Sequence, residues 1–180
     1  VVGNTIDNTS DYGIRFHGSE NTTIKDNILN PFRYRAIENN ELYQDAQILN
    51  NTILYQQNDQ WEVRAIEVNN SIIDGNIVKA DEYSRKAYLI SGQGNQITNN
   101  EFYFAENDDW SYTDAAIYSY GEHSIIEGNY IEYNGSIDAI KGSNFTIVNN
   151  QFINNNDDDN GWGYYSIRLE GPDNESIISG

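Results

Sequence analysis

The stretch Ile24-Lys25-Asp26-Asn27-Ile28-Leu29 contains a motif that recurs along the whole chain. The motif is an aliphatic residue, two intervening positions, an asparagine and, one or two residues later, another apolar side chain. Its asparagines, including that of a truncated first copy, are Asn4, Asn27, Asn51, Asn76, Asn100, Asn129 and Asn150. Successive asparagines are 23, 24, 25, 24, 29 and 21 residues apart. A period in the twenties indicates stacked repeats rather than a globule around one core, so we expect the function to lie on a surface.

Each period also contains an earlier apolar segment. These segments are centred on Ile14, Ile37, Ile66, Leu89, Ile117, Ile140 and Ile167. Three short alternating segments per period, separated by Gly, Asn, Asp and Ser, are typical of half-buried β-strands. Leucine-rich repeats have a similar period, but leucine is scarce and no segment has sustained helical spacing. We therefore predict an all-β fold, a right-handed single-stranded parallel β-helix of about seven rungs with three short parallel sheets.

The repeated asparagine lies at the predicted bend between the second and third strands of each rung. Asparagine tolerates the left-handed backbone conformation better than other non-glycine residues, which suits a tight bend. Stacked in register, these side chains would also form a hydrogen-bonded ladder.

Two segments carry a resemblance to a known family. Residues 12–27 and 139–150 resemble the repeats of the pectate-lyase-like, carbohydrate-active parallel β-helix proteins. The resemblance covers essentially the whole chain and implies the fold. It does not select one activity, because the same repeat occurs in lyases, glycosidases, epimerases, tailspikes and adhesins. The segment 13–18 is also similar to an arginine-bearing strand of alginate and chondroitin lyases, which implies a catalytic role for Arg15.

Composition limits the partners. With 28 acidic and 10 basic residues, the net charge of −18 argues against binding to nucleic acid or to an anionic membrane. No apolar run approaches the ~20 residues of a membrane helix, so we expect no membrane insertion. We treat residues 1–180 as a single domain and expect it to be a piece of a longer extracellular protein. Uncovered strand edges at its ends would favour end-to-end or lateral self-association.

The location of the protein is predicted from its glycosylation motifs. Asn-X-Ser/Thr sequons occur at Asn8, Asn21, Asn50, Asn69, Asn134, Asn144 and Asn174. Glycosylation would place the chain outside the cell or on its surface. The alternative is coincidence in an asparagine-rich repeat.

The lengths of the rungs alternate. The strand aliphatics are 23, 29, 23, 28, 23 and 27 residues apart, and each long rung adds an acidic loop with one tryptophan, Trp61, Trp110 or Trp162. Two rungs advance ~9.6 Å, which is similar to the length of a β-linked disaccharide. The tryptophans would form a row of sugar-stacking faces. Alternatively, they pack against the intervening short rungs.

The first strand of each rung is the predicted functional face. Strand alternation turns outward the residues that follow the core aliphatics, namely Arg15, Glu38, Glu67, Ile90, Tyr118, Lys141 and Arg168. Eight of the ten basic residues lie on this strand or in the loop before it: Arg15, Arg33, Arg35, Arg64, Arg85, Lys86, Lys141 and Arg168. We expect substrate to bind here.

Glu38 and Glu67 fall on successive rungs, ~5 Å apart in the backbone, which is compatible with the carboxylate pair of a retaining glycosidase. With Arg15 they are the candidate catalytic residues. Arg35 and Arg64, three residues earlier, would neutralise a uronate carboxylate or pair with the glutamates. The alternative for the whole group is a ladder of surface salt bridges.

Calcium is the one cofactor that the sequence suggests, although none is required. Asp157, Asp158 and Asp159 lie in a segment that begins like an EF-hand loop, but its twelfth position is Ile167 rather than glutamate. A solvated acidic turn is the alternative.

From these observations we expect a polysaccharide-engaging β-helix module, which would be part of a polysaccharide lyase or glycosidase if it is an enzyme. The alternative function is a structural or adhesive repeat segment of a cell-surface or filament protein.

Overall fold

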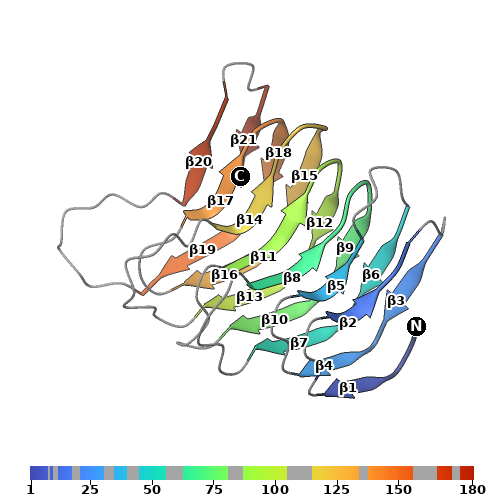
Figure 1. The fold of residues 1–180 in the computed structure, drawn as a ribbon. Coiled ribbons are helices and arrows are strands. Elements are labelled where there is room, and N and C mark those ends of the chain that lie inside the picture. The colour runs from blue at the N-terminus through green and yellow to red at the C-terminus, as the bar shows by residue number, and fades with distance from the viewer. Residues whose placement is uncertain are drawn as a thin grey trace.

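A computed structural model describes residues 1–7, 9, 12–17, 21–30, 35–39, 45–55, 63–80, 87–104, 115–133, 138–155, 166–171 and 175–180. Within these residues all regular structure is β, and the strands form three parallel sheets of seven strands each (Figure 1). Every strand pairs with the third strand after it in the chain, so the backbone visits the three sheets in turn. The predicted all-β parallel solenoid with three sheets is confirmed.

The strands are short. Sheet 1 contains β1 (Thr5–Asp7), β4 (Ile28–Asn30), β7 (Thr52–Tyr55), β10 (Ile77–Ala80), β13 (Glu101–Phe104), β16 (Tyr130–Tyr133) and β19 (Gln151–Asn154). Sheet 2 contains β2 (Tyr12–Arg15), β5 (Arg35–Glu38), β8 (Val63–Glu67), β11 (Ala87–Gly92), β14 (Ala115–Ser119), β17 (Asp138–Gly142) and β20 (Ile167–Leu169). Sheet 3 contains β3 (Thr23–Lys25), β6 (Gln47–Leu49), β9 (Ile72–Asp74), β12 (Gln96–Thr98), β15 (Ser124–Glu127), β18 (Phe145–Val148) and β21 (Ile177–Ser179).

The core is a stack of aliphatic side chains along the axis of the solenoid. In sheet 3 the register places the aliphatic residue of each repeat directly over the next, as in Ile48 over Ile73 and Ile73 over Ile97. These side chains are almost completely buried. Burying an isoleucine fully contributes ~1.5–3 kcal/mol, and β-branched residues suit the pleated surface. The repeat of the sequence is therefore the repeat of the core.

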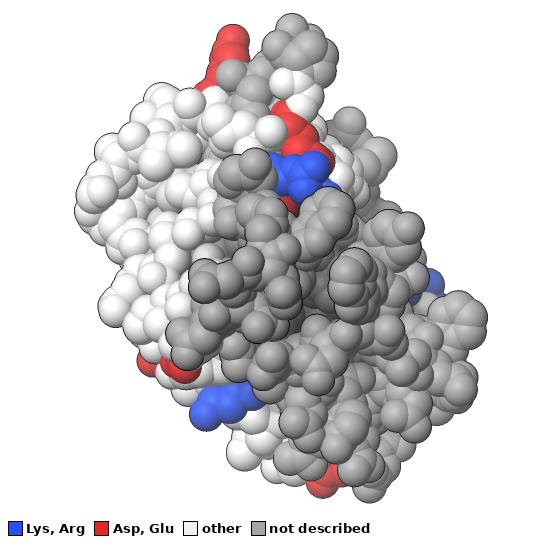
Figure 2. Space-filling view, turned by 90° about the vertical axis from the view of Figure 1, so that its left-hand side faces the viewer, with Lys and Arg blue, Asp and Glu red and all other residues white. Residues whose placement is uncertain are grey.

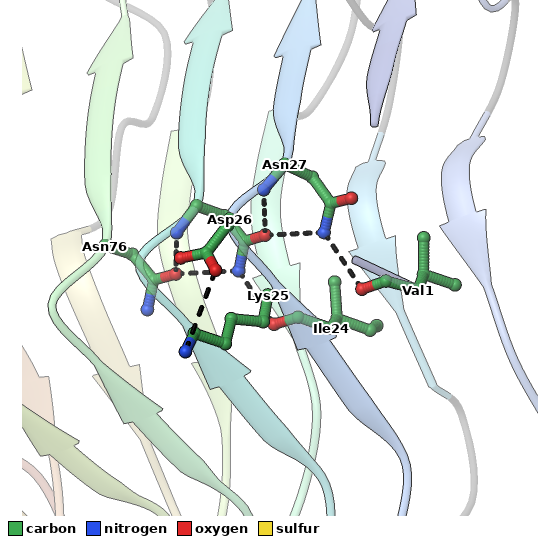
Figure 3. A network of polar contacts seen from close by, with 7 residues as sticks. Val1, Ile24, Lys25, Asp26, Asn27 and Asn76 are labelled. Carbon is green, nitrogen blue, oxygen red and sulfur yellow. Dashed lines mark hydrogen bonds and ion pairs between the residues drawn. The ribbon is translucent and has the colours of Figure 1, made fainter. Parts of the chain in front are cut away.

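The asparagine ladder is present at the turn between sheets 3 and 1. Asn51 donates from its backbone N to Oδ1 of Asn76 at 2.9 Å and from Nδ2 to the same oxygen at 3.0 Å. Nδ2 of Asn76 also donates to the carbonyl oxygen of Ile48 at 2.8 Å. The same pattern of bonds links Asn4 through to Asn150. Figure 3 shows the part of the ladder from Asn27 to Asn76, together with the bond from Asn27 to the carbonyl of Val1.

The proposed backbone role of these asparagines is wrong. The left-handed conformation belongs to the residue before each of them, as in Asp26 (φ 55°), Asn50 (φ 51°) and Gly75 (φ 66°). The ladder asparagine that follows is turned into the solenoid and is buried at all positions from Asn27 to Asn129. The physical reason is that the two positions have different roles. The residue before the ladder asparagine makes the bend, and the buried amide satisfies the backbone groups that the bend leaves without partners.

In the part of the chain that the structure describes, no helix is long and apolar enough to cross a membrane.

Candidate functional site

The residues that follow the core aliphatics in sheet 2 form a continuous row. The register places Arg15 opposite Glu38 and Glu38 opposite Glu67. In full, the row is Arg15, Glu38, Glu67, Ser91, Tyr118, Lys141 and Arg168. We call these seven residues the sheet 2 row. Six of the seven are the residues that alternation predicts.

The exception is Ile90, which the sequence places on the outer face. Ile90 pairs with Ile66 and Ile117 and is only 1% exposed, so it belongs to the core. Ser91 takes its place in the row. The two consecutive aliphatics Leu89 and Ile90 allow two strand registers, and a shift of one residue exchanges the inner and outer faces.

The first three rungs of sheet 2 carry a chain of alternating charges. Nε of Arg15 lies 2.9 Å from Oε2 of Glu38, and a guanidinium nitrogen of Arg35 lies 3.2 Å from Oε1 of Glu38. Arg35 also pairs with Glu67, which pairs in turn with Arg64. We call these five residues the Arg–Glu chain. Arg35 and Arg64 therefore pair with the glutamates, which is one of the two arrangements expected from the sequence.

Glu38 is fully buried, although strand alternation places it on the outer side of the sheet. Among the described residues neither of its carboxylate oxygens makes a hydrogen bond of standard geometry, so the two ion pairs offset its loss of hydration. The arginines that hold it remain partly exposed, 40% for Arg15 and 26% for Arg35. The Arg15 guanidinium also lies 4.6 Å from the ring centroid of Tyr12.

Glu38 and Glu67 are thus neighbours, as a catalytic pair requires, but they differ in access. The side chain of Glu67 is 20% exposed and that of Glu38 is 0% exposed. A sugar reaching the sheet would meet Glu67 and the guanidinium groups first. The catalytic roles of Glu38, Glu67 and Arg15 stay predictions.

The last rungs of the sheet 2 row also pair their cations with carboxylates. Arg168 is 51% exposed and lies 3.6 Å from Asp138, and Nζ of Lys141 lies 3.5 Å from Glu170. Lys141 also approaches the ring of Tyr118, at 5.8 Å from its centroid. These residues present partly exposed cations beside an aromatic ring. On the side of the molecule shown in Figure 2, the upper group of described charged residues likewise has basic and acidic atoms next to each other.

Several predicted site residues lie outside the described residues. They are Trp61, Trp110 and Trp162 of the proposed stacking row and Asp157, Asp158 and Asp159 of the proposed calcium loop. Both hypotheses stay predictions. Within the described ranges, no three His, Cys, Asp or Glu side chains are grouped so as to hold a metal ion.

A second cluster, on the outer face of sheet 1, was not found from the sequence. Tyr103 donates its hydroxyl hydrogen to Glu101 at 2.8 Å, and Tyr130 donates to Glu132 at 2.7 Å. The register sets Glu101 opposite Tyr130 and Tyr103 opposite Glu132, so tyrosine and glutamate alternate in both directions. The ring centroids of the two tyrosines are 5.6 Å apart. We call these four residues the Tyr–Glu cluster.

Two further side chains border the Tyr–Glu cluster. Nζ of Lys79 lies 4.8 Å from the ring centroid of Tyr103, and Nδ2 of Asn155 donates to Glu132 at 2.9 Å. The sequence does contain a pattern that predicts this cluster. On the third strand of two successive rungs, a tyrosine and a glutamate are two residues apart, and this spacing places both side chains on the same face of the strand.

The hydrogen bond to Glu101 is the main cause that raises the pKa of Tyr103 to about 12, since a phenolate would lose this bond and be repelled by the carboxylate. The bond to Glu132 raises the pKa of Tyr130 in the same way. We therefore expect Glu101→Gln to lower the pKa of Tyr103 toward its usual value of ~10. NMR titration of ring-labelled tyrosine measures this, with Glu127→Gln on sheet 3 as the control. An unchanged Tyr103 pKa in Glu101→Gln would contradict the contact.

The chain matches no protein-family model, no curated protein and no solved structure.

Proposed function

We propose that the chain binds a polysaccharide along the outer face of sheet 2, and that a uronate-containing polysaccharide fits this face best. The observation that carries the proposal is the concentration of basic side chains there, each of which also contacts a carboxylate. Of the seven basic residues in the described ranges, five belong to the sheet 2 row or the Arg–Glu chain: Arg15, Arg35, Arg64, Lys141 and Arg168. Guanidinium groups bind carboxylates through two parallel hydrogen bonds, which suits recognition of uronates.

The spacing of the strands supports the same proposal. Parallel strands lie ~4.8 Å apart, so two rungs advance by about the length of a disaccharide. A linear sugar chain lying along the solenoid would meet a new side chain of the row at each rung. Tyr118 offers an aromatic face beside Lys141 for stacking on a sugar ring.

The overall charge of −18 opposes the approach of a polyanion. This repulsion acts over a Debye length of only ~8 Å at physiological salt, so it is weak compared with contacts made directly on the sheet. We expect binding of a uronate chain to persist at physiological ionic strength.

The prediction that tests this face is the replacement of the last two cations of the sheet 2 row. We expect Arg168→Gln combined with Lys141→Gln to weaken polygalacturonate binding at least about tenfold, because two charge-assisted contacts are lost. Isothermal titration calorimetry measures the affinity.

The matched control is Lys25→Gln on sheet 3, which removes one charge from a side chain that is 42% exposed and paired with Asp26. It should bind as the wild-type protein does. Equal weakening by the control would mean that only net charge matters, and absence of polygalacturonate binding to the wild-type protein would refute the proposed function.

A catalytic version of this function is favoured by the adjacency of Glu38 and Glu67. Incubation with the same polygalacturonate decides it when product is measured along with binding. New reducing ends without unsaturated products would indicate a hydrolase, and new reducing ends accompanied by unsaturated uronate products would indicate a lyase.

A structural or adhesive role is the second candidate. It is favoured by the regularity of the asparagine ladder, which continues from Asn4 to Asn150 without interruption. Binding to no glycan, together with high resistance to unfolding, would favour this candidate.

A further inference from the structure

The outer face of sheet 1 carries a second arrangement suited to a ligand. The Tyr–Glu cluster is composed of two aromatic rings and two carboxylates on β13 and β16, bordered by Lys79 and Asn155. We propose that this cluster is a binding site for a neutral oligosaccharide. The site is separate from the sheet 2 row and does not depend on it.

The chemistry of the cluster fits a sugar ring. The C–H faces of a pyranose pack on aromatic rings, while its hydroxyl groups need hydrogen-bond acceptors and donors at the rim. Tyr103 and Tyr130 are only partly buried and their rings are close enough to meet neighbouring parts of one sugar chain. The carboxylates of Glu101 and Glu132 accept from the tyrosine hydroxyls and have further lone pairs for sugar hydroxyls.

The cluster is also partly organised before any ligand binds. Each carboxylate is oriented by a tyrosine hydroxyl on the same strand, and Glu132 is held in addition by Asn155. All of the clustered residues are on strands, which position side chains more firmly than loops do. A ligand would therefore lose little free energy in ordering the site.

The local charge selects a neutral ligand. The cluster holds two carboxylates, and of its two bordering side chains only that of Lys79, over the ring of Tyr103, is cationic, so the site has an excess of negative charge. A uronate or sulfated sugar would be repelled, whereas hydroxyl groups would donate to the carboxylates. This preference is opposite to that of the sheet 2 row, so the two faces would hold different sugar chains or different parts of one mixed polysaccharide.

The experiment is calorimetric titration of the full chain with neutral hexasaccharides of xylose, glucose and mannose, and separately with oligogalacturonate. We expect at least one neutral hexasaccharide to bind the wild-type protein. Tyr103→Ala combined with Tyr130→Ala should weaken this binding at least about tenfold, because both stacking faces are removed. Tyr103→Phe combined with Tyr130→Phe keeps the rings and should cost only a few-fold.

Two controls keep the result interpretable. Tyr120→Ala removes a tyrosine that is 48% exposed and follows β14 of sheet 2, and it should leave neutral-sugar binding unchanged. Melting curves of all variants should coincide with that of the wild-type protein, and the single variants Tyr103→Ala and Tyr130→Ala replace the double alanine variant if the latter unfolds.

The proposal is overturned if no neutral hexasaccharide binds, if the double alanine variant binds as the wild type does, or if Tyr120→Ala and not the cluster variant removes binding. Failure of oligogalacturonate to bind would refute the sheet 2 proposal and leave this one standing. Loss of neutral-sugar binding in the sheet 2 variant Arg168→Gln, with the cluster variant unaffected, would likewise overturn it.

Discussion

Replacement of Asn76 by alanine should lower the free energy of unfolding by about 3–5 kcal/mol, since several buried polar groups lose their partners at once. Oδ1 of Asn76 accepts two hydrogen bonds from Asn51, and its Nδ2 donates to the carbonyl of Ile48 and to Oδ1 of Asn100. Each buried donor or acceptor left unsatisfied costs ~1–3 kcal/mol. Urea unfolding followed by circular dichroism measures the change.

The matched control is Asn50→Gly. Asn50 is exposed, precedes a ladder residue and has φ 51°, a conformation that glycine adopts without strain. We expect the control to change the free energy of unfolding by less than ~0.5 kcal/mol. If Asn50→Gly destabilises as much as Asn76→Ala, the bend and not the buried ladder stabilises the stack.

The asparagine repeat was enough to predict the architecture but not the details of the turn. Asparagines that recur at a fixed period lie above one another when the rungs stack in register. The hydrogen-bonded ladder could therefore be predicted from the period alone. The period does not predict which residue of the turn adopts the left-handed conformation, because Asp26, Asn50 and Gly75 share no side-chain type. Their common property is the position directly before a buried asparagine, and burial is a property of the folded chain.

For the candidate site, the sequence likewise predicts which residues share a face of the sheet but not which of them contact one another. Alternation predicts the outer row wherever one aliphatic residue marks the core, and it failed at Ile90, where Leu89 gave a second choice of register. Contacts between rungs were harder to foresee. The ion pair from Arg35 to Glu67 crosses from one rung to the next, and so does the pairing of Tyr103 with Glu132, which requires the register of sheet 1.

The burial of Glu38 was not predictable from the sequence. Alternation sets which side of the strand a residue faces, but not what covers that side. Glu38 and Glu67 occupy equivalent positions on neighbouring strands, yet their side chains are 0% and 20% exposed. This difference leads to a prediction that separates a structural role from a catalytic one.

We expect Glu38→Gln to lower the free energy of unfolding by about 2–4 kcal/mol, because removing one charge from a buried ion pair leaves the partner charges uncompensated. The glutamine oxygen would still accept from one guanidinium, but its amide group would place donors against donors of the other, from Arg15 or Arg35. The partial exposure of both arginines moderates the loss. Urea unfolding at low and at high salt measures it, and the loss should persist at high salt since buried pairs are weakly screened.

Glu170→Gln is the comparison. Glu170 also contacts two cations, Lys141 at 3.5 Å and Arg168 at 3.7 Å, but its side chain is 37% exposed. Exposed pairs contribute ~0–1 kcal/mol, so this variant should stay close to the wild-type stability. A purely catalytic Glu38 would give a different result, loss of turnover with unchanged stability. If Glu38→Gln is as stable as Glu170→Gln, the Arg–Glu chain does not hold the first rungs of sheet 2 together, and Glu38 becomes the first residue to examine for catalysis.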